Sequence, residues 1–422
     1  MQPFKLSNNL SKITARQAET NSSVTNSVRE ILDDIKSNGD TAIRKYIERF
    51  DGYTGAGLLV TPDEIAAGVH AAGDDFMRIL RRAKQQITEY HANQIEKSWG
   101  MYKDNGVIMG QLVRPLSRVA LYVPGGTAAY PSTVLMNAVP AKLAGVTDIV
   151  IFTPVKADGK VPDVILAAAA CCGITEIYKI GGAQAVAAAA YGTSSIKKTD
   201  KIVGPGNIYV ATAKQLVYGM VGIDSIAGPS EILIIADETA NPAYIAADML
   251  SQAEHDEMAS AILVTTCENI IAETEKELAL QLEKLPRKGI AETSLKNYGA
   301  AVLAQSLKEA FEISNEVAPE HLEILTVNPL DKLPLVKNAG SVFLGEYTPE
   351  PLGDYMSGTN HVLPTGGTAK FSSPLGVYDF VKYSAYSYYP QNVLADFKDD
   401  VIKFAELEGF DAHANSVRVR FK

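Results

Sequence analysis

Metal chemistry in a protein usually needs imidazoles and carboxylates, and this chain of 422 residues has only six histidines. Gln252 and His255 are three positions apart in "MLSQAEHDEMAS", a segment of helical composition, so both can face the same way. The H-E-x-x-H spacing of metalloprotease helices is absent, so other ligands would have to come from elsewhere in the chain. The segment is therefore either half of a metal site or a charged helix end in solvent.

Three more histidines stand among polar or turn residues, each close in sequence to a carboxylate: Glu320 with His321, Asp354 with His361, and Glu408 with His413. Each histidine alone is typical of a hydrogen-bonded surface position, and "APEHL" alone also fits a capped helix end before a strand. Taken together, the imidazoles and carboxylates suffice for one metal ion and an acid–base pair. His70 and His91 lie in a helical region, where a surface or packing role is expected.

Three Gly-rich turns could hold phosphate groups, at residues 122–132, 180–185 and 203–210. Glycine lets a backbone come close to a ligand, and the helix that follows offers free N–H groups. None of the turns is the G-x-G-x-x-G dinucleotide fingerprint, because Tyr209 stands where the last glycine of the third turn would be. Each turn alone fits ordinary helix capping, so capping and nucleotide binding both remain open.

The elements that must position these residues follow from hydrophobic periodicity. Residues 21–100 have helical spacing, with a stop at Asn38-Gly39 between two helices. From residue 118, short β-branched runs alternate with helical stretches, and a second such series extends from residue 231 to about residue 345. This pattern predicts parallel sheets covered by helices, with ligands at the carboxyl ends of the strands. The seam between the two series falls near residues 227–232.

Composition excludes several classes of protein. The net charge of −10 argues against a nucleic-acid or anionic-membrane surface, and no apolar run reaches the length of a membrane helix. The N-terminal residues lack the apolar core of a signal peptide, so a cytoplasmic protein is expected. The three cysteines, Cys171, Cys172 and Cys267, form no disulfide framework and are expected to be buried, inert core residues.

Physical reasoning alone leaves three classes of function open. A metal-dependent hydrolase would use the histidine and carboxylate set. A nicotinamide-dependent dehydrogenase with a bound metal would also use the Gly-rich parallel sheet. A two-lobed ligand-binding protein is the third possibility, and the missing signal peptide counts against it.

Long motifs add a resemblance that covers nearly the whole chain. The segments "YVPGGTAAYPSTVLMNAVPAKLAGV", "KIVGPGNIYV", "AGPSEILIIAD", "MLSQAEHDEMASAILVT", "APEHLEI" and "GDYMSGTNHVLPT" closely resemble the histidinol dehydrogenase family. The resemblance implies oxidation of L-histidinol through L-histidinal to L-histidine by two NAD molecules at one site. It also implies one zinc ion per subunit, two Rossmann-like parallel-sheet domains without the usual fingerprint, and an intertwined homodimer.

The same resemblance assigns roles to individual residues. Glu320 and His321 match the catalytic pair. The zinc ligands would be Gln252, His255, Asp354 and, from the partner subunit, His413. The substrate would contact Ser230, His321, His361 and Glu408 beside the zinc ligands, and NAD would contact Tyr122, Gln184 and Asn207.

The expected domain boundaries complete the sequence predictions. We expect an N-terminal arm over residues 1–20 and a C-terminal dimerisation lobe over 376–422. Between them we expect one discontinuous Rossmann-like domain made of residues 21–121 and 231–375, and a second over 122–230. The fold class is therefore α/β, with small helical lobes at both ends.

Overall fold

The computed structural model describes residues 5–8, 22–55, 57–125, 129–226 and 228–422. They divide into two compact units, which we describe separately. The first unit combines Met1–Gln94 with Leu116–Phe380, and the second combines Ile95–Pro115 with Val381–Lys422. The N-terminal arm expected over residues 1–20 lies outside the described residues, apart from residues 5–8, and so does residue 227 in the expected seam.

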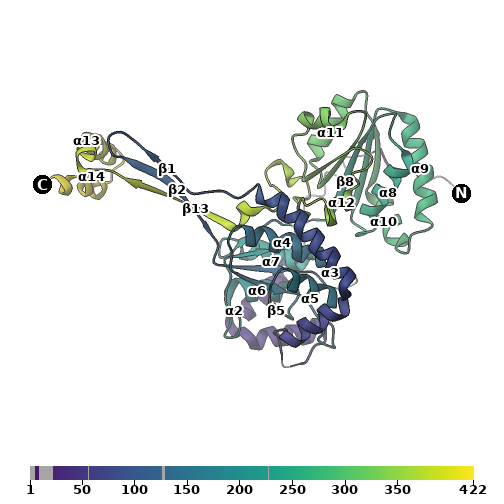
Figure 1. The fold of residues 1–422 in the computed structure, drawn as a ribbon, viewed down its shortest axis with the longest axis horizontal. Coiled ribbons are helices and arrows are strands. Elements are labelled where there is room, and N and C mark those ends of the chain that lie inside the picture. The colour runs from purple at the N-terminus through teal and green to yellow at the C-terminus, as the bar shows by residue number, and fades with distance from the viewer. Residues whose placement is uncertain (1–4, 9–21, 56, 126–128, 227) are drawn as a thin grey trace. The chain divides into compact units, whose positions relative to one another are not determined.

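The first unit contains two parallel sheets (Figure 1). The first sheet has the order β5-β4-β3-β6-β7, with its strands at Arg118–Tyr122 (β3), Asp148–Phe152 (β4), Glu176–Tyr178 (β5), Lys201–Val203 (β6) and Gly222–Ile223 (β7). All neighbouring pairs are parallel. The central strand β3 is buried along its whole length, as expected of a strand covered on both faces.

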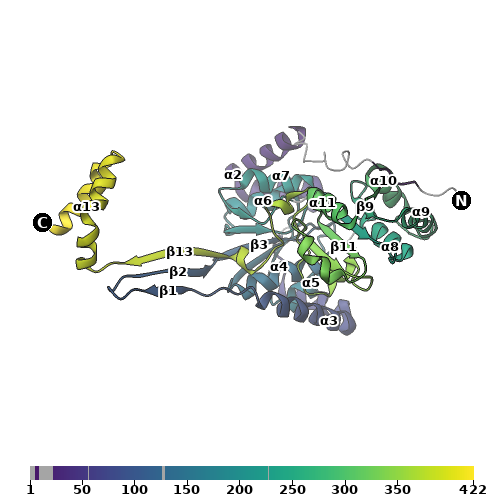
Figure 2. The ribbon, with the colours of Figure 1, turned by 90° about the horizontal axis from the view of Figure 1, so that it is seen from above.

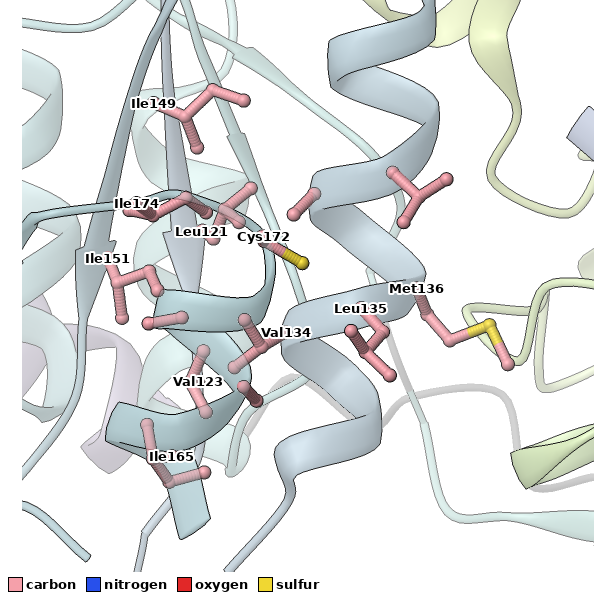
Figure 3. Packing of buried hydrophobic residues seen from close by; sticks show 14 of the residues in the cluster. Leu121, Val123, Val134, Leu135, Met136, Ile149, Ile151, Ile165, Cys172 and Ile174 are labelled. Carbon is pink, nitrogen blue, oxygen red and sulfur yellow. The ribbon is translucent and has the colours of Figure 1, made fainter. Parts of the chain in front are cut away.

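Helices cover both faces of the first sheet (Figure 2). One face packs against α2 (Ser22–Asp51), α6 (Gly182–Tyr191) and α7 (Ile208–Val217), and the other against α3 (Pro62–Ala92), α4 (Pro131–Leu143) and α5 (Asp163–Cys171). On the second face, Leu121 and Ile151 of the sheet meet Val134 of α4 and Ile165 of α5 (Figure 3). The result is a three-layered core with the sheet between two helical layers.

The two N-terminal helices belong to this first sheet. The predicted stop at Asn38-Gly39 is present as a break inside α2, where Gly39 has φ 51° and ψ −129°. Both α2 and α3 bury their apolar faces against the helices of the first sheet. The grouping of residues 21–121 with 231–375 therefore differs from the packing, because helix periodicity shows which face of a helix is apolar but not which sheet covers it.

The second sheet has the order β10-β9-β8-β11-β12, and its strands are also all parallel. Its strands are β8 (Glu231–Ala236), β9 (Ser260–Thr265), β10 (Gly299–Leu303), β11 (His321–Leu325) and β12 (Ser341–Leu344). The helices α8 (Pro242–Ala253), α9 (Glu268–Leu282) and α10 (Lys288–Tyr298) cover one face, and α11 (Leu307–Val317) covers the other (Figure 1). Counted along the chain, both sheets have the strand order 3-2-1-4-5, which is the Rossmann order 3-2-1-4-5-6 without its sixth strand.

Shorter elements complete the first unit. A single-turn helix, α12 (Glu350–Tyr355), follows β12, and 3₁₀ turns span Pro329–Leu335, Thr368–Lys370 and Val377–Phe380. Ser7 forms a parallel bridge with Ala300 on the edge strand β10. The predicted α/β class with two Rossmann-like parallel sheets is confirmed.

The second unit is an antiparallel sheet followed by helices. Its strands, β1 (Trp99–Tyr102), β2 (Ile108–Pro115) and β13 (Val381–Tyr388), have the order β1-β2-β13. The helices α13 (Gln391–Leu407) and α14 (Asp411–Arg418) follow, and a 3₁₀ turn spans Val419–Phe421. Of the helices in the described ranges of both units, none is long and apolar enough to cross a membrane.

Candidate active site

The predicted catalytic pair, Glu320 and His321, lies beside Glu231 at the amino ends of the neighbouring strands β11 and β8. Because β8 and β11 are parallel neighbours, residues 230–231 and 320–321 meet at one edge. The backbone N–H of Glu231 donates to Glu320 Oε2 at 2.9 Å, and the carbonyl of Glu231 lies 3.0 Å from His321 Nδ1. One residue of β8 therefore orients both members of the pair.

The hydrogen bond to Glu231 also defines the tautomer of His321. A carbonyl oxygen can only accept, so Nδ1 carries the proton and donates it to the carbonyl of Glu231. The opposite nitrogen, Nε2, lies 3.7 Å from Glu350 Oε1. Burial lowers the pKa of His321 to about 4, so the imidazole is neutral at pH 7 and Nε2 is free to accept a proton.

Two carboxylates on α12 face this histidine. Glu350 and Asp354 are four positions apart on one helical turn, and one ligand atom from each of His321, Glu350 and Asp354 lies within 4.8 Å of the others. Asp354 Oδ1 also lies 3.6 Å from His361 Nδ1. The predicted residues His321, Asp354 and His361 are thus close together, and Glu350 joins them.

The carboxyl end of α8 supplies Gln252, and His255 follows it. Gln252 is 1% exposed, and its Oε1 accepts no hydrogen bond. His255 is exposed, and its Nδ1 lies 2.9 Å from the carbonyl of Ser251, which fixes the proton on Nδ1 and leaves Nε2 available. The Ser251 hydroxyl lies 3.3 Å from Glu350 Oε2, so this helix end adjoins the carboxylates of α12.

The charge of this cluster is unbalanced. Burial raises the pKa of Glu320 well above its usual range, and burial together with the charge of Asp354 raises the pKa of Glu350 to about 8. Within the described ranges, the ion-pair partners of Glu320, Glu350 and Asp354 are histidines. Buried carboxylates without a Lys or Arg partner are stabilised by a bound cation, so the cluster fits a metal ion.

The nearby donors suit a divalent metal ion. They offer a buried amide oxygen without a hydrogen-bond partner among the described residues, a carboxylate, and an imidazole whose other nitrogen binds a backbone carbonyl. These features belong to Gln252, Asp354 and His255, which are three of the four predicted ligands. The fourth, His413, lies exposed on α14 of the second unit, and Glu408 lies exposed at the end of α13 in the same unit.

A cavity of about 950 Å³ opens at the carboxyl ends of the first sheet. Its lining includes Tyr122 at the end of β3, Gln184 in the first turn of α6, and Asn207 before α7. The three residues predicted to contact NAD are therefore in one place. A volume of this size is in the range of cofactor sites.

Hydrogen bonds fix the turns that line this cavity. The backbone N–H of Gly182 donates to the Tyr122 hydroxyl at 3.0 Å, and burial raises the pKa of that hydroxyl to about 12. Asn207 caps α7 by accepting from the N–H groups of Tyr209 and Val210. Gly204 has φ +111°, and a side chain there would collide with the carbonyl of Tyr122. Capping and ligand contact are thus compatible roles for the same turns.

The cysteines only partly match their prediction. Cys172 is 2% exposed and burial raises its pKa to about 12, whereas Cys171 and Cys267 are half-buried at helix ends. Periodicity placed Cys171 on a buried helical face, but it is the last residue of α5, where the covering layer ends.

Sequence reasoning missed two residues of the site, Glu350 and Ser251. The spacing of Glu350 and Asp354 in "PEPLGDY" was the available signal, because two carboxylates at i and i+4 share one face of a helix. The contact of Ser251 with Glu350 joins segments 99 residues apart, and no local pattern encodes it.

The chain thus combines two Rossmann-like sheets, with a histidine–carboxylate cluster at one and a cavity at the other. Comparison with known proteins identifies its family. The family described as "Histidinol dehydrogenase" matches residues 14–421, so the chain belongs to the histidinol dehydrogenase family.

Individual relatives agree with this assignment. A histidinol dehydrogenase of Lactococcus lactis is 62% identical over 419 residues, covering 99% of this chain and 97% of that protein. One of Clostridium acetobutylicum is 56% identical over 407 residues, covering 96% and 94%. The crystal structure of histidinol dehydrogenase from Elizabethkingia anophelis has a TM-score of 0.93 and 38% identity, covering 99% of this chain and 97% of that one.

Proposed function

We propose that the protein oxidises L-histidinol through L-histidinal to L-histidine, with NAD as oxidant and one zinc ion per subunit. The observation that carries this proposal is the buried, neutral His321, whose Nε2 is free beside Glu350 and Asp354. Family membership supplies the substrate, and the site supplies a base, a cation-binding cluster and a separate cofactor-sized cavity. As a biosynthetic enzyme that uses NAD, it would act in the cytoplasm.

His321 is the proposed general base in both oxidations. Its Nε2 accepts the alcohol proton in the first step and a proton of the aldehyde hydrate in the second. Holding Nδ1–H on the carbonyl of Glu231 keeps the imidazole in the required orientation throughout. A base contributes about 10²–10⁴-fold to the rate when it is placed in this way.

Glu320 is the proposed base for hydration of the aldehyde. Its Oε2 accepts from the N–H of Glu231, so the carboxyl is held in place and its other oxygen can take a proton from water. Burial raises the pKa of Glu320, and the positive charge of a bound zinc ion would lower that pKa again. The ionised carboxylate that a base requires would then form more readily near pH 7. Glu320→Gln should therefore slow the oxidation of histidinal.

Zinc would be held by Gln252, His255, Asp354 and His413 of the partner subunit. When bound, it would fix the imidazole and amino groups of the substrate so that the carbinol carbon faces the nicotinamide. Ser230, His361 and Glu408 are the remaining proposed substrate contacts. His361 is tied to Asp354 on one side and to the hydroxyl of Thr133, at 3.5 Å, on the other, so its ring is already oriented.

NAD would occupy the cavity of the first sheet and accept the hydride. Tyr122, Gln184 and Asn207 are its proposed contacts, and the start of α6, which has no side-chain cap, would present N–H groups to its phosphates. None of the cysteines takes part in this scheme, so replacing all three with alanine should preserve both oxidations apart from a packing cost.

The direct test is NADH formation from L-histidinol with and without a chelator, combined with metal analysis. We expect about one zinc per chain, and His255→Asn should lose both metal and turnover. The exposed His70 provides a matched control, because His70→Asn should keep both. A metal-free enzyme with full activity would contradict the zinc proposal.

A second test concerns the homodimer and the proposed contribution of His413 in trans. His255→Asn and His413→Asn should each be inactive, but a mixed dimer would contain one site with both residues intact. Random reassociation of equal amounts should make half of the dimers mixed, so about a quarter of wild-type activity should return. No recovery in proven heterodimers would contradict the trans site.

A further inference from the structure

Four carboxylates line the cavity of the first sheet and have no role so far: Glu30, Asp51, Asp158 and Asp163. Asp51, the last residue of α2, differs in that its Oδ2 is shielded from solvent and accepts no hydrogen bond from a described residue. Burial raises the pKa of Asp51 to about 6, and no hydrogen bond or ion pair with a described residue offsets that effect. The folded protein thus keeps an uncompensated acid where a ligand could donate to it.

The first sheet lacks one part of the dinucleotide fingerprint, the acidic residue that directly follows the second strand. In Rossmann folds an acidic residue after the second strand binds the adenosine ribose hydroxyls. Here the second strand is β4, and Thr153 and Pro154 follow it. The next acid, Asp158, is exposed and already accepts from the N–H of Lys160.

Asp51 lies near the end of this second strand, although it belongs to α2. An added Cβ on the following residue, Gly52, would lie 3.5 Å from Cβ of Ala157, in the loop after β4. The charge of Asp51 also contributes to the raised pKa of Tyr122, at the end of β3. Asp51 is therefore close to the ends of both β3 and β4, between which the adenosine ribose lies in this fold.

We propose that Asp51 binds the adenosine ribose hydroxyls of the dinucleotide and makes the protein select NAD over NADP. This inference rests on the proposed function, because it assumes that the cavity binds NAD. A carboxylate accepts from the vicinal hydroxyls of a ribose and repels the 2′-phosphate of NADP. Three cations, Arg49, Lys156 and Lys160, also line the cavity and would favour that phosphate if the carboxylate were removed.

The test measures dinucleotide binding to the full-length protein by titration calorimetry, without histidinol. Asp51→Asn should weaken NAD binding about tenfold while NADP binding is unchanged or stronger, since a hydrogen bond to a charged group is lost. Asp51→Glu keeps the charge and should still reject NADP. Glu48→Gln removes the same charge from an exposed position of α2 and should change neither affinity.

Three results would overturn the proposal. The first is unchanged selectivity in a folded Asp51→Asn protein. The second is an equal loss of both affinities together with a lower melting temperature, which would indicate a structural role. The third is lost discrimination against the hypoxanthine analogue of NAD rather than against NADP, since the partner would then be the adenine amino group. Wild-type protein that neither binds NAD nor forms NADH would instead refute the proposed function.

Discussion

The two sheets of the first unit have the same strand order, yet the cavity of the first and the histidine–carboxylate cluster of the second lie at opposite ends of the strands. In the first sheet the cavity lies at the carboxyl ends, where Tyr122 and Asn207 follow β3 and β6. In the second sheet the histidine–carboxylate cluster lies at the amino ends, where Glu320 and His321 begin β11. Shared topology therefore does not determine which edge is used.

The residue that follows the first strand differs between the two sheets. Asp237 directly follows β8 and is buried; it accepts from the N–H of Val327 at 2.8 Å and from the N–H and hydroxyl of Thr239. The bond to Val327 joins the loop after β8 to the loop after β11 at the carboxyl ends of the second sheet. The corresponding residue after β3 is Val123, whose apolar side chain packs in the core and can form no such bond.

The largest expected effect is at the amino edge of the second sheet. His321→Asn should reduce NADH formation from histidinol by about 10³-fold or more, because it removes the proposed base. NAD affinity, measured separately by calorimetry, should stay within about twofold, because His321 does not line the cavity. A comparable loss of NAD affinity would show that the two edges do not act separately.

The next effect is a loss of stability at Asp237, at the carboxyl ends of the second sheet. Asp237→Asn should lower the free energy of unfolding by about 2–3 kcal/mol, since a buried charged acceptor of three hydrogen bonds is replaced. Denaturant unfolding measures this loss. The KM values for histidinol and NAD should not change in the folded variant, and a change in either would contradict a purely structural role for this edge.

A smaller effect is expected at the open edge of the first sheet. Tyr122→Phe removes the acceptor for Gly182 N–H and should weaken NAD binding by about tenfold, or about 1–1.5 kcal/mol. The matched control is Tyr178→Phe, because Tyr178 donates to the carbonyl of Ser195 and is not part of the cavity lining. Equal effects of the two substitutions on NAD affinity would show that Tyr122 has no specific role in NAD binding.

The smallest effect is a pH dependence of stability at the same edge. The pKa of Asp51 is raised from 3.8 to about 6 in the folded protein, so folding favours the protonated form. Stability should therefore fall as pH rises from about 4 to about 6, and the loss should persist above that. Allowing for partial exposure, Asp51→Asn should be more stable than wild type by about 1 kcal/mol at pH 7 and equal to it near pH 4. A constant difference across this range would contradict the raised pKa.

Local patterns predicted the elements well and their partners less well. The β-branched runs predicted the strands of both parallel sheets except the two-residue β7, and the Gly-rich turns fall at the strand and helix ends that hold Tyr122, Gln184 and Asn207. The rule that ligands gather at carboxyl ends did not predict the histidine–carboxylate cluster at the amino ends of the second sheet. The hydrogen bond between Asp237 and Val327, at the carboxyl ends, joins residues 90 positions apart and is encoded by no local pattern. Glu350 escaped notice for a similar reason: its importance comes from burial beside His321, which only the fold creates.

The register of the second unit has a consequence for how the chain is made. The strand β2 pairs with β13, which is encoded near the carboxyl terminus, so this pairing can form only late in synthesis. Trp99 of β1 and Tyr386 of β13, which share a hydrogen bond, are 287 positions apart. During synthesis the hairpin of β1 and β2 therefore emerges long before β13. Both parallel sheets can form first, because their strands lie between the two halves of this ribbon. A nascent chain stalled before residue 381 should accordingly bind chaperones through residues 99–115, the one segment whose sheet is still incomplete.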